Sequence, residues 1–240
     1  KCSVSKEVKR VYGGRGVMPT TLMGMYQLLE SNLRKAAEYD PEKEGVEPNE
    51  KLAAIRLAID GKMPMMISCD DANSRQLVME IVKPYEKMKV IFTMMAGMSE
   101  LDLTLDPERV SFIDGFAGGD YDPRSMNKNY KIIKALAEKG MRIAVCGKTA
   151  GSYSREWVLW EGMELTKHID DEEKVLSMMT SEPARMLGID DMTGSIEVGK
   201  RADLVVWSMN PLSDFRARVL QTMLAGKVVY QEGDEIKCYC

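Results

Sequence analysis

Hydrophobic and polar positions in the middle of the chain alternate between short apolar runs and longer stretches with helical spacing. The apolar runs predict strands over residues 63–69, 89–94, 110–113 and 142–146. Helical spacing predicts helices that begin at Asn73 and at Asn129, and Gly140 is expected to end the second one. Apolar strands separated by helices are typical of a parallel sheet that is covered on both faces. The pattern therefore predicts an α/β fold.

Outside this region the pattern is helical upstream and becomes strand-like downstream. Residues 22–39 and 50–59 are expected to form helices, joined by an exposed loop at 40–49. Thr180 can begin a short helix that ends at Gly188. Short strands are then predicted over residues 194–197, 202–207 and 227–230. We therefore expect an α/β domain over residues 1–190 and a small β portion over residues 191–240.

Composition narrows the class of protein. The chain has 240 residues, of which 45% are hydrophobic and 29% charged, and its formal net charge is -4. Nucleic acid is not expected as a partner, because no block of Lys and Arg is present. A membrane span is not expected either, since no apolar run is long enough. Five cysteines without a framework spacing indicate a reduced, cytoplasmic chain, and the role of Cys238 and Cys240 stays open.

The most specific motifs lie near the end of the chain. Residues 180–188 read TSEPARMLG, residues 194–207 read GSIEVGKRADLVVW, and residues 226–230 read GKVVY. These motifs resemble the C-terminal signature of the amidohydrolase superfamily, in its imidazolonepropionase-related and prolidase-like branch. The opening, with KRVYG at residues 9–13 and MPTT at residues 18–21, is similar to a mid-chain segment of the same branch. The resemblance covers nearly the whole chain.

The resemblance implies a (β/α)8 TIM-type barrel with a small C-terminal β-sandwich portion. A complete barrel takes about 250 residues, and the similarity to this chain begins about halfway through the family barrel. We therefore expect a partial barrel that lacks the N-terminal strands and the His-x-His motif of the family metal site. A homo-oligomer or a partner chain could complete the barrel, and a truncated or processed chain would have the same sequence.

The resemblance also implies where metal ligands should stand. Enzymes of the family hold one or two divalent metals, such as zinc, at the ends of the barrel strands, where the metal activates a water. The family pattern places His at Ser68 and Asp70, a Glu-His pair at Phe92 and Thr93, and the catalytic Asp at Lys148. An ammonium group cannot accept a proton from metal-bound water and repels the metal. The sequence therefore predicts no catalytic residue, no metal ligand and no cofactor.

The substituted positions would still surround one pocket at the strand ends if the barrel geometry persists. This candidate pocket consists of Ser68, Cys69, Asp70, Asp71, Thr93, Cys146 and Lys148. Lys148 could form an ion pair with Asp70 or Asp71, or it could serve as an anion-binding or Schiff-base lysine. Cys69, Cys146 and Asp70 could instead form a new metal site. The single histidine, His168, is expected to be an exposed residue of a polar helix.

Two functions follow from these substitutions, together with a weaker third. The first is an amidohydrolase-like subunit with a degenerate metal site that is non-catalytic or binds a small molecule. The second is a metal-dependent hydrolase of C–N bonds, in a cyclic amide or a dipeptide, whose metal ligands come from another chain. The third is a structural remnant that assembles through an exposed sheet edge.

Overall fold

The computed structural model describes residues 1–93, 97–114, 123–146 and 157–233. The chain divides into two compact units, Lys1–Ala144 and Val145–Cys240, and each is described here by itself. Within the described ranges, no helix combines the length and the hydropathy that crossing a membrane requires.

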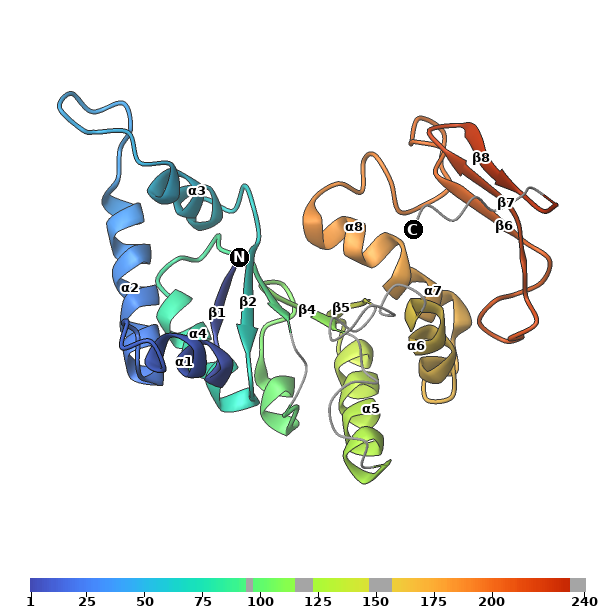
Figure 1. Ribbon diagram of the computed structural model, residues 1–240, viewed down its shortest axis with the longest axis horizontal. Helices are drawn as coiled ribbons and strands as arrows, with labels where there is room; N and C mark the ends of the chain where they lie inside the picture. The colour runs from blue at the N-terminus through green and yellow to red at the C-terminus, as the bar shows by residue number, and fades with distance from the viewer. Residues whose placement is uncertain (94–96, 115–122, 147–156, 234–240) are drawn as a thin grey trace. The chain divides into compact units, whose positions relative to one another are not determined.

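The first unit is built on a five-stranded sheet with the strand order β1-β2-β3-β4-β5 (Figure 1). Its strands are β1 (Cys2–Val4), β2 (Met65–Cys69), β3 (Val90–Thr93), β4 (Val110–Asp114) and β5 (Arg142–Val145). Strands β1 to β4 pair in parallel. The predicted α/β class and the four predicted strands are confirmed. The three-residue β1 of this sheet was not predicted, because so short a run carries little pattern.

Helices connect and cover these strands. They are α1 (Lys6–Gly13), α2 (Leu22–Glu38), α3 (Glu50–Ile59), α4 (Ala72–Val82), the 3-10 helix η1 (Glu100–Thr104) and α5 (Pro123–Glu138). The predicted cap of α4 was two residues late: Asp71, not Asn73, caps the helix by accepting the Ser74 amide. The predicted start of α5 was also late, since the helix begins at Pro123, a residue favoured in a first helical turn.

The two faces of the sheet differ in burial. One face carries Ile67, Phe92 and Phe112 side by side in register, all fully buried, and the two phenyl rings lie 5.9 Å apart. The other face carries Met66 and Ser111 on either side of Ile91, and these two side chains are only half-buried. The first face is thus fully buried, whereas the second is buried at Ile91 and half-buried on either side of it.

A buried ion pair fixes the loop after β3 to helix α4. The Arg75 guanidinium donates to both carboxylate oxygens of Asp102, at 2.7 and 2.8 Å, and neither side chain is exposed. Asp102 also accepts the Ser99 amide in a capping box that begins η1. Arg75 further donates to the Gly97 carbonyl, and its guanidinium lies 6.0 Å from the centre of the Phe112 ring. These contacts tie α4, η1 and the sheet into one packed core.

The second unit contains three helices and a three-stranded antiparallel sheet. The helices are α6 (Trp157–Thr166), α7 (Glu172–Met179) and α8 (Ser181–Leu187), and the strands are β6 (Leu204–Trp207), β7 (Val219–Leu224) and β8 (Lys227–Gln231). The sheet lies within the predicted β portion, although the domain boundary at residue 190 stays a prediction. As predicted, α8 ends at Gly188, whose φ of 68° suits glycine.

Three local expectations in this unit are wrong. Residues 194–197 do not form a strand; Gly194 and Ser195 lie in a bend, and the next two residues have no regular structure. Thr180 precedes α8 without a side-chain capping bond, because its hydroxyl donates to the Leu176 carbonyl of α7. His168 lies in the turn after α6 rather than in a helix, and its side chain is half-buried.

Candidate functional site

The carboxyl edge of the parallel sheet carries a row of hydroxyl side chains. Ser68 is the fourth residue of β2, and the register places it opposite Ser3 of β1 and Thr93 of β3. Ser68 is only 8% exposed, whereas Ser3 and Thr93 are half-buried. Ser3 also shares a hydrogen bond with the Ser5 hydroxyl at 3.0 Å. Because side chains at equivalent register positions point to the same face, Ser3, Ser68 and Thr93 form one hydroxyl row across three strands.

The two aspartates that follow β2 cap helices. Asp70 accepts the backbone amide of Lys6, at 2.5 Å, and so holds the first residue of α1. Asp71 accepts the Ser74 amide at 2.8 Å, and this bond is the main reason why the pKa of Asp71 lies below its usual range. Each carboxylate therefore meets the partial positive charge of a helix N-terminus. No residue of the described ranges forms an ion pair with either one.

Cys69 lies on the other face of the sheet from the hydroxyl row. It is opposite Val4 in register, next to Ser68 along β2, and its side chain is fully buried. Burial raises the pKa of the Cys69 thiol to about 12, with Arg75 acting in the opposite direction. A thiol that stays protonated at neutral pH is a poor metal ligand and a poor nucleophile.

Cys146 and Lys148 are the two remaining members of the candidate pocket predicted from the sequence. Cys146 follows β5, is half-buried and belongs to the second unit. Lys148 lies outside the described residues. The structure thus brings Ser68 and Thr93 together and places Asp70 and Asp71 beside them, while Cys69 points to the opposite face.

Sequence reasoning missed two residues at this edge. Tyr26 of α2 is buried and hydrogen-bonds the Ser74 side chain, and burial raises the pKa of its hydroxyl. Gly97 packs so closely on the turn after β2 that a Cβ there would lie 2.9 Å from the Asp70 carbonyl oxygen. Its φ of 60° also requires glycine. The glycine was visible in the sequence, but nothing in the sequence indicated which turn it approaches.

Among the described residues, the donor set at this edge does not fit a catalytic divalent metal. Hydroxyl groups remain protonated at neutral pH, whereas the ligands of such metals are imidazoles, carboxylates and thiolates. In the part of the chain that the structure describes, no group of three or more His, Cys, Asp or Glu side chains is arranged to hold a metal ion. No hydrolytic step can be derived from the described residues.

Comparison with known proteins places the chain in a family. Residues 20–229 match the model of the amidohydrolase family. The imidazolonepropionase of Rhizobium meliloti (strain 1021) is 35% identical over 89 residues, which cover 36% of this chain and 21% of that enzyme. A 5-methylthioadenosine/S-adenosylhomocysteine deaminase of Desulforudis audaxviator (strain MP104C) is 56% identical over 36 residues, or 15% of this chain and 8% of that enzyme. The aligned segments therefore span only a small part of these relatives.

A solved structure extends the likeness to nearly the whole chain. The crystal structure of an amidohydrolase from Thermotoga maritima MSB8 superimposes with a TM-score of 0.77 at 24% identity. The match covers 93% of this chain and 60% of that protein. It supports the fold, an α/β structure consistent with part of a TIM barrel followed by a small antiparallel sheet. On the match over residues 20–229, the chain belongs to the amidohydrolase family.

Proposed function

We propose that this chain is an amidohydrolase-fold protein that binds a small molecule at the carboxyl edge of its parallel sheet without metal-dependent hydrolysis. The observation that carries the proposal is the hydroxyl row Ser3, Ser68 and Thr93. Function depends on the site rather than on the fold. At Ser68 and Thr93, where the family resemblance implies metal-binding imidazoles, the row offers neutral groups that donate and accept hydrogen bonds.

The surroundings of the row support a neutral ligand. Asp70 and Asp71 already accept helix amides, so their negative charge is partly compensated within the protein. Met66 and Ile113 lie on the same face as the row and are half-buried, which adds apolar surface. A few hydrogen-bonding groups set among apolar side chains suit a small, uncharged polar molecule.

Metal analysis tests the proposal directly. The purified 240-residue chain is equilibrated with Zn²⁺ and dialysed against metal-free buffer, and the metal is then counted by mass spectrometry. We expect far less than one zinc per chain and no loss of folded protein on chelation. One tightly held zinc per chain, together with hydrolysis of a cyclic amide or dipeptide that chelation abolishes, would contradict the proposal.

Two matched variants locate any zinc that is retained. Cys238→Ser with Cys240→Ser removes the thiols of the C-terminal tail, and Ser68→Ala with Thr93→Val removes two hydroxyls of the row. We expect residual zinc to disappear with the cysteines and to be unchanged by the second pair. Zinc that is lost only with Ser68 and Thr93 would place a metal at the sheet edge.

A second candidate function is a metal-dependent hydrolase of C–N bonds whose metal ligands come from another chain. Two observations favour it: the chain matches 60% of the Thermotoga maritima amidohydrolase, and one face of its sheet is only half-buried. Isolation of the chain from its source under mild conditions tests this function. A co-purifying chain that carries a His-x-His motif, together with bound metal, would favour it over the first.

The cellular compartment is also a proposal. Cys2 and Cys69 are free thiols, and Cys69 is buried in the sheet. Free thiols persist in reducing compartments, which supports a cytoplasmic location.

A further inference from the structure

Helix α1 is a basic amphipathic helix with an exposed apolar stripe. Residues 6–15 contain four basic side chains and one acidic side chain. Val11 and Tyr12 follow Val8 at helical spacing and are 39% and 44% exposed, and α1 has no buried residue. Amphipathic helices bury their apolar stripe against another surface. The apolar side of α1 is therefore an unpartnered surface within the described chain.

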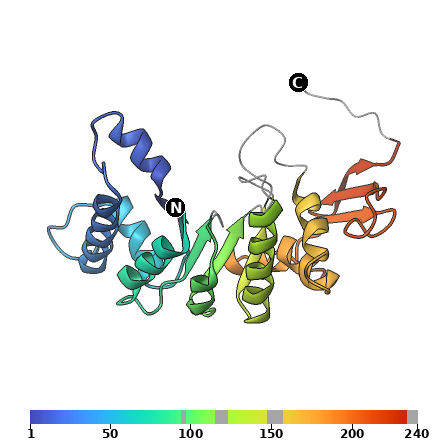
Figure 2. The ribbon, with the colours of Figure 1, turned by 90° about the horizontal axis from the view of Figure 1, so that it is seen from below.

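The orientation of α1 is fixed at its first turn. The Ser5 hydroxyl accepts the Val8 amide, and Asp70 accepts the Lys6 amide. Strand β1, which directly precedes the helix, pairs with β2. Figure 2 shows that α1 projects away from α2, α3 and α4. The helix is thus held in a position where it presents its apolar and basic side chains to solvent.

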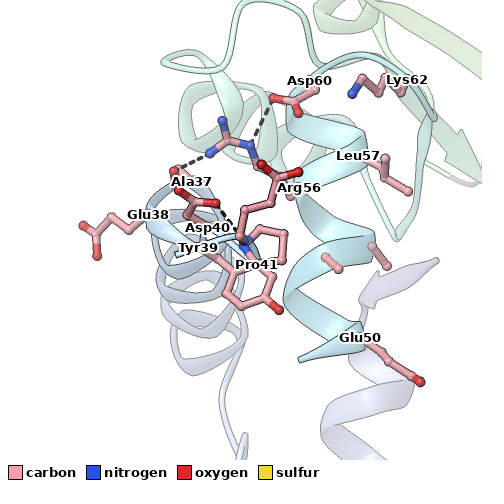
Figure 3. A pocket seen from close by; sticks show the side chains of 13 residues that line it. Ala37, Glu38, Tyr39, Asp40, Pro41, Glu50, Arg56, Leu57, Asp60 and Lys62 are labelled. Atoms are coloured by element: carbon pink, nitrogen blue, oxygen red, sulfur yellow. Dashed lines mark hydrogen bonds and ion pairs between the residues drawn. The ribbon is translucent and has the colours of Figure 1, made fainter. Parts of the chain in front are cut away.

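A hollow of about 880 Å³ lies between α2 and α3. Its lining is mainly acidic and so has the opposite charge to helix α1. Residues 38–50, which run from the end of α2 to the start of α3, contain six acidic side chains and one basic side chain. Glu38, Asp40, Glu42 and Glu50 line the hollow. Two basic side chains also line it: Arg56 donates to the Ala37 carbonyl and to Asp60 (Figure 3), and Lys62 is exposed. With Asp60 included, the lining still has five acidic side chains against these two basic ones.

The same hollow offers apolar surface. Pro41, Ala53, Ala54 and Leu57 line it, and Leu57 is 43% exposed. Helix α3 carries apolar side chains on all sides, yet only Ala58 of this helix is buried. A helix that is apolar all round is normally covered. The acidic groove, which we define as the lining of this hollow, therefore matches α1 in both charge and polarity pattern.

We propose that the acidic groove of one copy of this chain docks the basic helix α1 of a second copy. Docking within one copy is excluded by geometry. Helix α1 begins beside Asp70, just past the end of β2, whereas Asp60 and Lys62 of the groove precede the start of β2. Helix α2 has 17 residues, a length of about 25 Å. Because the contact joins two different surfaces, it builds a ring, an open chain or a reciprocal dimer.

Charge reversal tests the contact while leaving the folding contacts in place. One variant carries Lys9→Glu and Arg15→Glu on α1, and the other carries Glu38→Lys and Glu42→Lys in the groove. Sedimentation velocity of the 240-residue chain is measured over a wide concentration range at low and high salt. We expect the wild type to self-associate, high salt to weaken this association, and each variant alone to raise the apparent dissociation constant at least about tenfold.

Mixing the two variants gives the decisive measurement. The reversed α1 of one variant matches the reversed groove of the other, and the unchanged surfaces also match, so the mixture is expected to recover association. Lys83→Glu with Lys131→Glu changes the net charge as much as the α1 variant and is expected to associate like the wild type. A monomeric wild type, a mixture that stays dissociated, or a control that dissociates as the α1 variant does would overturn the proposal.

Discussion

Arg75 and Asp102 are a fully buried pair of opposite charges in the first unit. Their mutual hydrogen bonds, with those from Ser99 and to Gly97, compensate the loss of hydration. A buried pair of this kind is expensive to break, because removal of one partner leaves an uncompensated charge in the core.

Asp102→Ala is expected to lower the free energy of unfolding by about 3–5 kcal/mol, since Arg75 would remain buried without its carboxylate. Urea unfolding followed by circular dichroism measures this change. The double variant Arg75→Met with Asp102→Leu should be less destabilised than Asp102→Ala. A loss below about 1 kcal/mol for Asp102→Ala, the range of exposed pairs, would show that Arg75 reaches water.

Cys69 gives a prediction about pH. Its pKa is about 12 in the folded chain, above the ordinary value of 9.0, because burial disfavours the thiolate. The unfolded state therefore loses this proton first as the pH rises, and the stability from burying a neutral thiol decreases above pH 9. Between pH 9 and pH 10 we expect a loss of about 1 kcal/mol from this group. Cys69→Ala should lose less stability over this interval in urea unfolding.

Alkylation of the native chain checks the same burial independently. Iodoacetamide at pH 8 should modify the half-buried Cys146 well before Cys69, as read by peptide mass spectrometry. Rapid modification of Cys69 in the folded protein, or an identical pH dependence for wild type and Cys69→Ala, would contradict the burial.

At the scale of elements, α4 shows what the sequence could not resolve. Asp71 and Asn73 are both good capping residues and both precede an apolar helical pattern, so the sequence alone does not choose between them. The structure places Asp71 at the cap and makes Asn73 an exposed residue of the first turn. The choice is made by tertiary contacts: the turn after β2 packs on Gly97.

Asp71→Ala and Asn73→Ala form a matched pair for this assignment. Removal of the Asp71 carboxylate loses the bond to the Ser74 amide and should destabilise the chain by about 1 kcal/mol, whereas Asn73→Ala should be nearly neutral. The pKa of Asp71 is lowered in the fold, so its stabilisation is present near neutral pH and is lost in acid. Thermal unfolding at neutral and acidic pH measures both effects. Equal effects of the two substitutions would refute the assignment of Asp71 as the cap.

For the candidate site as well, the sequence predicts the strands but not which strand-end residues lie together. Strand positions were predictable from apolar runs, and alternation along β2 implies that Ser68 and Cys69 face opposite sides. The pairing of Ser68 with Thr93 depends on strand register, which the sequence pattern does not specify. The contribution of Ser3 could not be predicted, because β1 is a short strand that pairs with β2 across more than sixty residues of chain.

At the scale of the whole molecule, the two sheets differ in how much of their surface is buried. Strands β2 and β3 consist mostly of buried residues. In contrast, Val205 and Val206 of β6 and Val228 and Val229 of β8 are all exposed. Consecutive residues of a strand point to opposite faces, so within the described ranges both faces of the small sheet carry exposed apolar side chains. Its fold class was predictable from the turn-rich sequence, but its lack of cover was not.

This difference in burial predicts which of the two sheets unfolds locally more easily. Local stability follows the density of buried apolar contacts, so amides of β6 to β8 should exchange with solvent through smaller fluctuations than amides of β2 to β4. Native-state hydrogen exchange with peptide mass spectrometry should show full protection in β2, β3 and β4 long after β6 and β8 have exchanged. The amides of β7, which pairs on both sides, should exchange last within the small sheet. Equal protection of the two sheets would mean that another surface, such as a further part of the protein or a second copy, covers Val206 and Val228.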